Sequence, residues 1–160
     1  MSLLTRSEAT WPQSQSDSVP ALAGFVVSAF SPLAAHIAAR CLEQVTATER
    51  TAVIIVSATG DLETAEATAK AVDAGQRPGP LLFYQAVPNA VAGYIAAKHG
   101  LAGPVICLGP QRPGLDEGLA VADLLIRDGD ADEALIISVE QAMVPGGTGN
   151  AIAVLVKGGN

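Results

Sequence analysis

Short apolar runs recur along the chain and are separated by polar segments or by segments with helical periodicity. Continuous apolar runs of this length, rich in branched side chains, are typical of strands that are buried on both faces. The pattern predicts five strands, at residues 21–29, 51–57, 105–108, 134–139 and 151–156.

Helical spacing of apolar residues fills most of the intervals between these runs. Ser31 and Pro32 are suited to the start of the first helix, as its N-cap and first helical residue. Further helices are predicted at residues 62–74, 87–99 and 115–127. Because helices alternate with apolar strands, we expect an α/β fold with a mostly parallel sheet. The short turn at 144–150 requires the last two strands to be antiparallel.

The N-terminal segment has a different composition from the rest. Residues 10–20 are rich in Ser, Gln and Pro, a composition typical of a flexible arm. We therefore expect residues 1–20 to form a flexible arm and residues 21–160 to form one domain. With neither a signal-peptide pattern nor an apolar run long enough to span a membrane, we expect a cytoplasmic chain without a membrane partner.

Charge and hydropathy narrow the choice of partners. The 160 residues include 9 Lys+Arg and 16 Asp+Glu, a formal net charge of −7, which argues against binding to a nucleic-acid backbone. Only 16% of the residues are charged and the mean hydropathy is +0.36. We therefore expect part of the apolar surface to contact another protein. Cys41 and Cys107 lie in apolar segments and are interpreted as buried, reduced thiols.

No pattern of catalytic or ligand-binding residues emerges from the remaining positions. His36 and His99 cannot be placed beside a nucleophile, and Cys107 is expected inside a strand, where packing is its usual role. The acidic segment 127–133 lacks the spacing of a calcium loop. The glycines at 146–149 join two strands, whereas a phosphate site needs a helix start. The residues alone therefore indicate a non-catalytic α/β domain with no metal and no cofactor.

One segment resembles a known family. Residues 87–104, VPNAVAGYIAAKHGLAGP, are similar to the helix-and-strand element of the β-ketoacyl synthases, with Asn89, Ala92-Gly93 and the Gly-Leu-x-Gly-Pro pattern at 100–104. Residues 120–140 resemble the helix and strand that follow. The resemblance extends over about 21–157 and implies the N-terminal half of a three-layer thiolase-like fold, a five-stranded mixed sheet with helices on both faces.

The resemblance also implies a lost active site. In the family the nucleophilic cysteine lies eight residues after the proline that corresponds to Pro104, and this position is Arg112 here. Cys107 lies too early to replace it. The family's two catalytic histidines belong to a C-terminal half that we expect this chain to lack. Decarboxylative condensation by this chain alone is therefore not expected, and Arg112 is interpreted either as filling the vacated pocket or as an exposed turn residue.

A ketosynthase-like chain without a nucleophile resembles the chain-length factor of type II polyketide systems. The resemblance implies a heterodimer or heterotetramer with a full-length ketosynthase, in which this chain shapes the tunnel for a polyene or fatty-type chain carried by acyl carrier protein. The implied partner interface comprises Val87, Asn89, Val91, Tyr94, Val105, Ile106, Cys107 and Leu108. The implied acyl-tunnel residues are Thr59, Gly60, Leu62, Leu81, Leu82, Phe83 and Tyr84.

Several alternatives remain open at this stage. The small residues Thr59 and Gly60 leave space for a long chain, and Phe83 and Tyr84 are candidate stoppers, but residues 81–84 are equally compatible with ordinary core packing. A homodimeric ketosynthase-like scaffold without a tunnel is the first alternative function. A small enzyme of another class, using His99 or the carboxylates at 128–133, is the second.

Overall fold

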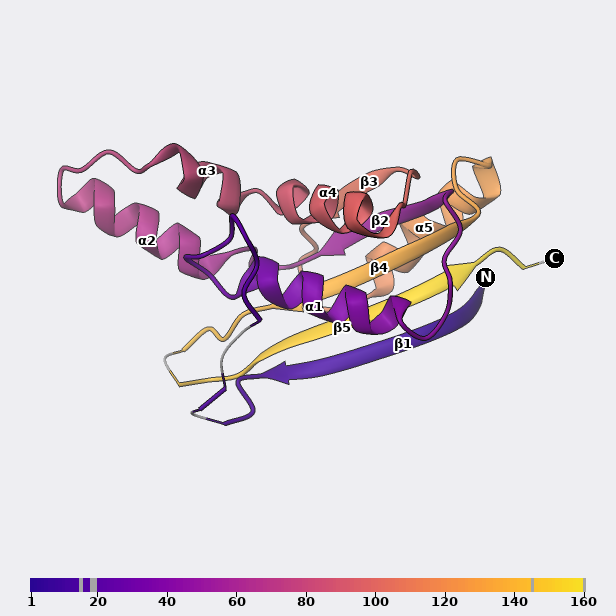
Figure 1. Ribbon diagram of the computed structural model, residues 1–160, viewed down its shortest axis with the longest axis horizontal. Coiled ribbons are helices and arrows are strands. Elements are labelled where there is room, and N and C mark those ends of the chain that lie inside the picture. The colour runs from indigo at the N-terminus through magenta and orange to yellow at the C-terminus, as the bar shows by residue number, and fades with distance from the viewer. Residues whose placement is uncertain (15, 18–19, 145, 160) are drawn as a thin grey trace.

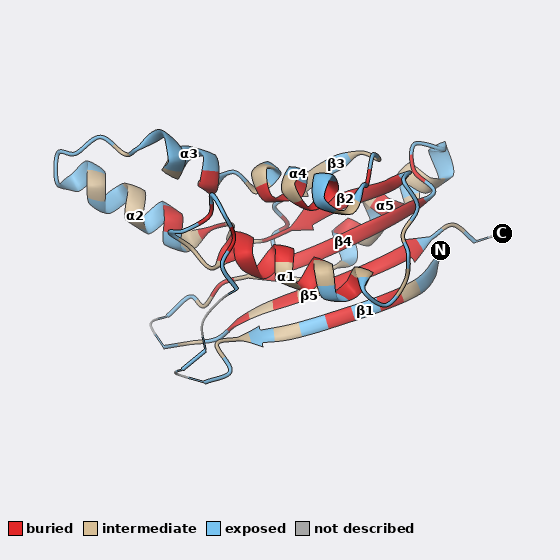
Figure 2. Ribbon diagram, viewed as in Figure 1, coloured by how far each residue is buried: buried red, intermediate tan, exposed pale blue. Residues whose placement is uncertain are grey.

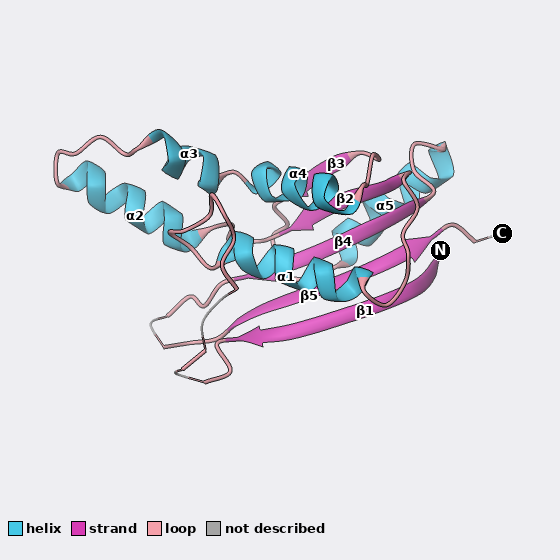
Figure 3. Cartoon of the chain, in the orientation of Figure 1, coloured by secondary structure: helices cyan, strands magenta, loops and turns pink. Residues whose placement is uncertain are grey.

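A single mixed sheet with helices on both faces forms the core of the computed structural model, which describes residues 1–14, 16–17, 20–144 and 146–159 (Figure 3). The strands are β1 (Ser2–Trp11), β2 (Thr51–Val56), β3 (Val105–Leu108), β4 (Glu133–Glu140) and β5 (Gly149–Lys157). The helices are α1 (Phe30–Leu42), α2 (Leu62–Asp73), α3 (Pro80–Ala86), α4 (Pro88–His99) and α5 (Asp116–Asp128). The expected α/β class is confirmed.

The strand order in the sheet is β1-β5-β4-β2-β3. Strands β3 and β4 both pair with β2 in parallel, whereas β5 is antiparallel to its two neighbours, β4 and β1. The expected antiparallel pairing of the last two strands is confirmed. The order leaves β3 at one edge of the sheet and β1 at the other, so each presents one row of backbone groups without a neighbouring strand.

Two apolar clusters cover the two faces of the sheet and give the molecule three layers (Figure 1). Helices α1 and α4 pack on one face, and α5 packs on the other. The α5 helix approaches the sheet closely at Gly118, where a Cβ atom would lie 2.5 Å from Ile136 Cγ2. The three-layer arrangement implied by the family resemblance is therefore confirmed.

The expected flexible arm at residues 1–20 is wrong over its first half, because Ser2–Trp11 forms an edge strand paired with β5. The sequence conceals this strand because its polar residues face inward. Thr5 and Ser7 are buried, and their hydroxyls hydrogen-bond to the Gln44 side chain at 2.8 Å each. Leu3, by contrast, is 60% exposed. Residues 15 and 18–19 of the expected arm lie outside the described residues.

The strand expected at 21–29 is also wrong. This segment is a loop in which Leu22 and Phe25 are buried and joined by an isolated antiparallel bridge. Ala29 is the N-cap of α1, so Ser31 lies inside the first turn rather than capping the helix. The apolar residues that suggested a strand serve instead to attach a loop to the core.

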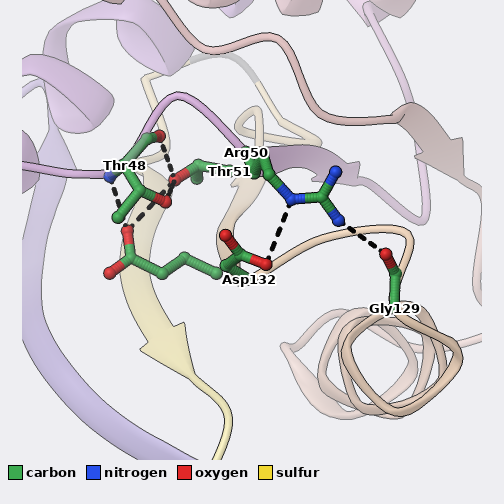
Figure 4. Close-up of polar contacts among 6 residues, drawn as sticks. Thr48, Arg50, Thr51, Gly129 and Asp132 are labelled. Atoms are coloured by element: carbon green, nitrogen blue, oxygen red, sulfur yellow. Dashed lines mark hydrogen bonds and ion pairs between the residues drawn. The ribbon is translucent and has the colours of Figure 1, made fainter.

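Polar contacts fix the amino-terminal ends of β2 and β4 (Figure 4). The buried Glu133 carboxylate accepts hydrogen bonds from Thr48 N at 2.8 Å and Thr51 Oγ1 at 3.1 Å. On the outside, Arg50 donates to Asp132 at 3.1 Å and to the Gly129 carbonyl at 2.6 Å. These bonds tie the loop before β2 to the turn before β4 and align the two central parallel strands.

Helices α2 and α3 extend away from the sheet, as Figure 1 shows at the left end of the molecule. Both are largely exposed in Figure 2, in contrast to the buried central strands. Thr64 is the buried residue of α2 and Gln85 that of α3. No helix in the described residues is long and apolar enough to cross a membrane.

Candidate functional site

The β3 edge carries the first part of the candidate site. Pro104 O accepts from Val53 N at 2.9 Å, and Leu108 O accepts from Ser57 N at 3.0 Å. Because peptide groups alternate in direction along a strand, the backbone groups of Val105 and Cys107 point away from β2. Val105 is 41% exposed. The edge is therefore open to pairing with another strand.

Helix α4 packs against β3 and completes this surface. Of the predicted interface residues, Val87, Asn89 and Val105 are exposed, whereas Tyr94, Ile106, Cys107 and Leu108 are half-buried. Val91 is fully buried in the core of this chain, so it supports the surface from inside and is not accessible to a partner.

Cys107 is held as a thiol at this edge. Its Sγ lies 3.0 Å from Asn89 Oδ1, to which it donates, and burial raises its pKa to about 11. The pKa of His99 is lowered, mainly by burial and to a smaller extent by the positive charge of Lys98. In the described part of the chain neither cysteine has a histidine as hydrogen-bond partner, so no activated thiolate is assembled here.

Arg112 lies in the turn between β3 and α5 and is exposed. It forms no hydrogen bond or ion pair with the residues that the structure describes. The exposure of Arg112 fits the interpretation as a turn residue, while a hollow of about 380 Å³ that it lines with Asp116 and Glu117 keeps an acidic neighbourhood open to it.

Glu140, at the carboxyl end of β4, organises the loop that contains Thr59 and Gly60. Its carboxylate accepts from Ala58 N at 2.6 Å, Thr59 N at 3.2 Å and Thr59 Oγ1 at 2.8 Å. Ser57 Oγ adds a bond of 3.3 Å and in turn accepts from Gly60 N. The predicted tunnel residues Thr59 and Gly60 therefore belong to a fixed turn. Glu140 was not among the predicted site residues because nothing local in the sequence brings it to β2.

The other predicted tunnel residues lie on α3 and at the start of α2. Phe83 is 78% exposed and Tyr84 is 49% exposed, with Leu81 similarly exposed and Leu82 half-buried. The alternative that residues 81–84 are ordinary core is therefore wrong for Leu81, Phe83 and Tyr84, and stays open for the half-buried Leu82. Leu62 is half-buried and lines a separate groove of about 730 Å³ beside Trp11 and Met143. Neither Thr59 nor any residue of α3 lines this groove.

Metal ligands do not gather at these positions. Within the described residues no group of three His, Cys, Asp or Glu side chains is close enough to hold an ion. The carboxylates at 128–133 are instead used in turns and surface pairs, such as Arg50 with Asp132. The site is thus an open strand edge with exposed and half-buried apolar side chains, an arrangement suited to binding another chain.

The sequence of residues 4–146 matches the model of the family described as "Beta-ketoacyl synthase, N-terminal domain". The chain belongs to this family. It is also similar in fold to a structure of the ketosynthase ApeO in complex with its chain length factor ApeC from Xenorhabdus doucetiae. The TM-score is 0.74 at 18% identity, and the match covers 99% of this chain and 80% of the matched one.

Two further structures share the fold of this ketosynthase-family chain. The ishigamide ketosynthase/chain length factor matches with a TM-score of 0.66 at 20% identity over 85% of this chain. A type II acyl-carrier protein in complex with its ketosynthase, AntDE:AntF, matches with a TM-score of 0.63 at 16% identity over 82% of it. The chain spans 44% and 47% of those two matched chains. No curated protein sequence matches it.

Proposed function

We propose that this chain is a non-catalytic, chain-length-factor-like subunit that pairs with a full-length ketosynthase and shapes the acyl tunnel in polyketide or fatty-type chain elongation. The observation that carries the proposal is Arg112, an exposed arginine in the turn where the resemblance places the family's nucleophile. A family member with an arginine here has no thiolate to accept an acyl group.

The open β3 edge supports pairing with a partner. Strand edges with exposed apolar side chains are rarely left uncovered, because they recruit other chains. Addition of a partner strand along Val105 and Cys107 would use their outward backbone groups. The likeness to a chain of a ketosynthase–chain length factor complex, of which this chain spans 80%, is consistent with such an assembly.

The exposed aromatic residues of α3 support a role in chain length. Phe83 is 78% exposed and Tyr84 49% exposed, so much of each side chain is available to line a space shared with the partner. Each buried CH₂ of an acyl chain contributes about 0.8 kcal/mol, whereas overpacking costs about 1–3 kcal/mol. A side chain at the end of the tunnel is therefore sufficient to stop a further extension. Acyl carrier protein would deliver the chain through the ketosynthase.

The test is co-expression of this chain with a full-length ketosynthase of a type II polyketide system from the same source, followed by size-exclusion chromatography and product analysis. We expect the two chains to elute together. Expressed alone, the ketosynthase should lose activity or release products of less uniform chain length. Separate elution, with a ketosynthase fully active by itself, would overturn the proposal. If this chain alone forms a stable homodimer that excludes the ketosynthase, the homodimeric scaffold replaces it.

A further inference from the structure

The loop at 20–29 and helix α3 are far apart in sequence but joined by one buried side chain, Gln85. Gln85 is 3% exposed, in a helix whose neighbouring residues are largely exposed. Its Oε1 accepts hydrogen bonds from Val26 N and Val27 N, both at 3.2 Å. Burying an amide is costly unless it is hydrogen-bonded, so the two bonds to Oε1 offset part of this cost and fix the loop to the helix.

A ring contact reinforces the same junction. Phe25, which is buried, lies 5.6 Å from Tyr84 between ring centroids. The loop therefore holds the helix on two sides, at Tyr84 and at Gln85. The side chain of Val26, next to this junction, is 76% exposed.

The loop also encloses a hollow of about 380 Å³, lined by residues of the loop and by Pro32. None of the described residues that line it is ionisable, and Ser28 supplies its one polar side chain. A hollow lined almost entirely by apolar side chains favours an aliphatic ligand, because it offers few groups that could bind and orient a polar one.

From these contacts we infer that Gln85 is a positioning residue: it latches the 20–29 loop onto α3, and the hollow of that loop forms part of the wall against which the acyl chain ends. This inference rests on the proposed function for its occupant, whereas the latch itself is a property of the isolated chain. The loop is an addition to the tunnel residues implied by the family resemblance, none of which precedes Thr59.

The substitution Gln85→Met tests the latch, because methionine has a similar length but accepts no hydrogen bond from Val26 N or Val27 N. It also removes a buried Nε2 that has no partner among the described residues, which limits the cost to global stability. Gln85→Glu keeps an acceptor for both amides. Gln76→Met, at an exposed position, is the matched control.

The first measurement is hydrogen exchange of the isolated full chain. In Gln85→Met the amides of Val26 and Val27 should exchange about tenfold faster or more, while the amide of Ile136 in β4 keeps its protection. Gln85→Glu and Gln76→Met should match the unchanged chain. Unaltered exchange at Val26 and Val27 in Gln85→Met would overturn the latch, whether or not a ketosynthase binds.

The second measurement is the product of the ketosynthase complex, analysed by mass spectrometry. Gln85→Met should form the complex normally but release a broader or shifted set of chain lengths, whereas Gln85→Glu restores the original set. An intact complex with unchanged products would overturn the assignment of the occupant. Loss of the complex in Gln85→Met would show that the loop contacts the partner protein instead, and would also overturn it. Failure of the unsubstituted chain to bind any ketosynthase counts against the proposed function and leaves the exchange result standing.

Discussion

Thr59 Oγ1 donates a hydrogen bond of 2.8 Å to Glu140 and so joins the loop after β2 to the end of β4. The same carboxylate accepts from the backbone amides of Ala58 and Thr59. A residue at the end of one strand thus determines the path of the chain leaving its neighbour. This relationship places the start of α2, and with it the protruding pair of helices.

Substitution of Glu140 should therefore be destabilising although the residue is only half-buried. Glu140→Ala leaves two backbone donors without their acceptor, and we expect a loss of about 2 kcal/mol in the free energy of unfolding, against about 1 kcal/mol for Thr59→Val. Urea denaturation measures both. Thr46→Val, at an exposed position, should have no effect. Identical urea midpoints for Glu140→Ala and the unchanged chain would contradict this account.

The β3 edge should be sensitive to charge only when a partner is present. Val105→Lys places an ammonium group on an exposed edge position, where it opposes strand addition, and we expect affinity for the ketosynthase to fall about tenfold or more. Leu3→Lys, at the exposed position on the opposite edge strand β1, is the matched control and should bind normally. Calorimetric titration of both variants decides the matter. Equal affinities would show that the β3 edge is not the interface.

The exposed aromatic residues of α3 should affect products rather than stability. Phe83→Ala removes a side chain that is 78% exposed, so the free energy of unfolding should change by less than about 0.5 kcal/mol. The complex should nevertheless release longer chains, because the tunnel gains space. Val72→Ala, 58% exposed on α2, should alter neither property. A product profile unchanged in Phe83→Ala would remove this residue from the tunnel.

Cys107 gives the protein a predictable response to alkaline pH. Burial raises its pKa in the folded chain to about 11, above the ordinary thiol value of 9.0, so the folded chain holds the thiol proton more tightly than the unfolded chain. The resulting contribution to stability is complete below pH 9 and is lost as the pH rises toward 11. We expect the free energy of unfolding to decline over this interval.

The control for Cys107 is Cys107→Ala, which should show a shallower decline because the other alkaline groups titrate in both proteins. At pH 8 about one thiol in a thousand is ionised, so alkylation by iodoacetamide should be slow in the folded chain and fast after unfolding. Rapid alkylation of the folded chain near neutral pH would contradict the burial of this thiol.

Much of the fold could be predicted from local patterns because four of the strands are continuous apolar segments. Strands β2 and β4 are almost entirely buried. Because both of their faces are covered, they appear in the sequence as nearly continuous apolar runs. The first strand could not be found this way. In β1 the inward positions Thr5 and Ser7 are satisfied by Gln44, whose distance in sequence is 39 residues from Thr5 and 37 from Ser7, and no local rule anticipates that partner.

The residues of the candidate site likewise fall into those predicted from local sequence and those found only in the structure. The β3 edge and α4 were predicted from their sequence, through the resemblance at 87–104, and Arg112 was located by its spacing from Pro104. Glu140 and Gln85 were not predicted, since each acts on backbone amides more than 50 residues away in the chain, at separations of 82 and 59 residues. A single polar side chain in an apolar segment carries no local sign of such a role.

The sequence by itself determined the family, the alternation of helices and strands, and the absence of a cysteine at the turn before α5, because these depend on residue types at short, fixed spacings. Only the tertiary structure decided that the N-terminal segment is an edge strand, that Leu81, Phe83 and Tyr84 are exposed, and that Gln85 joins α3 to the 20–29 loop. The reason is physical: burial and hydrogen-bond pairing are set by neighbours distant in the chain, and the same apolar residue serves as core or as surface according to what packs against it.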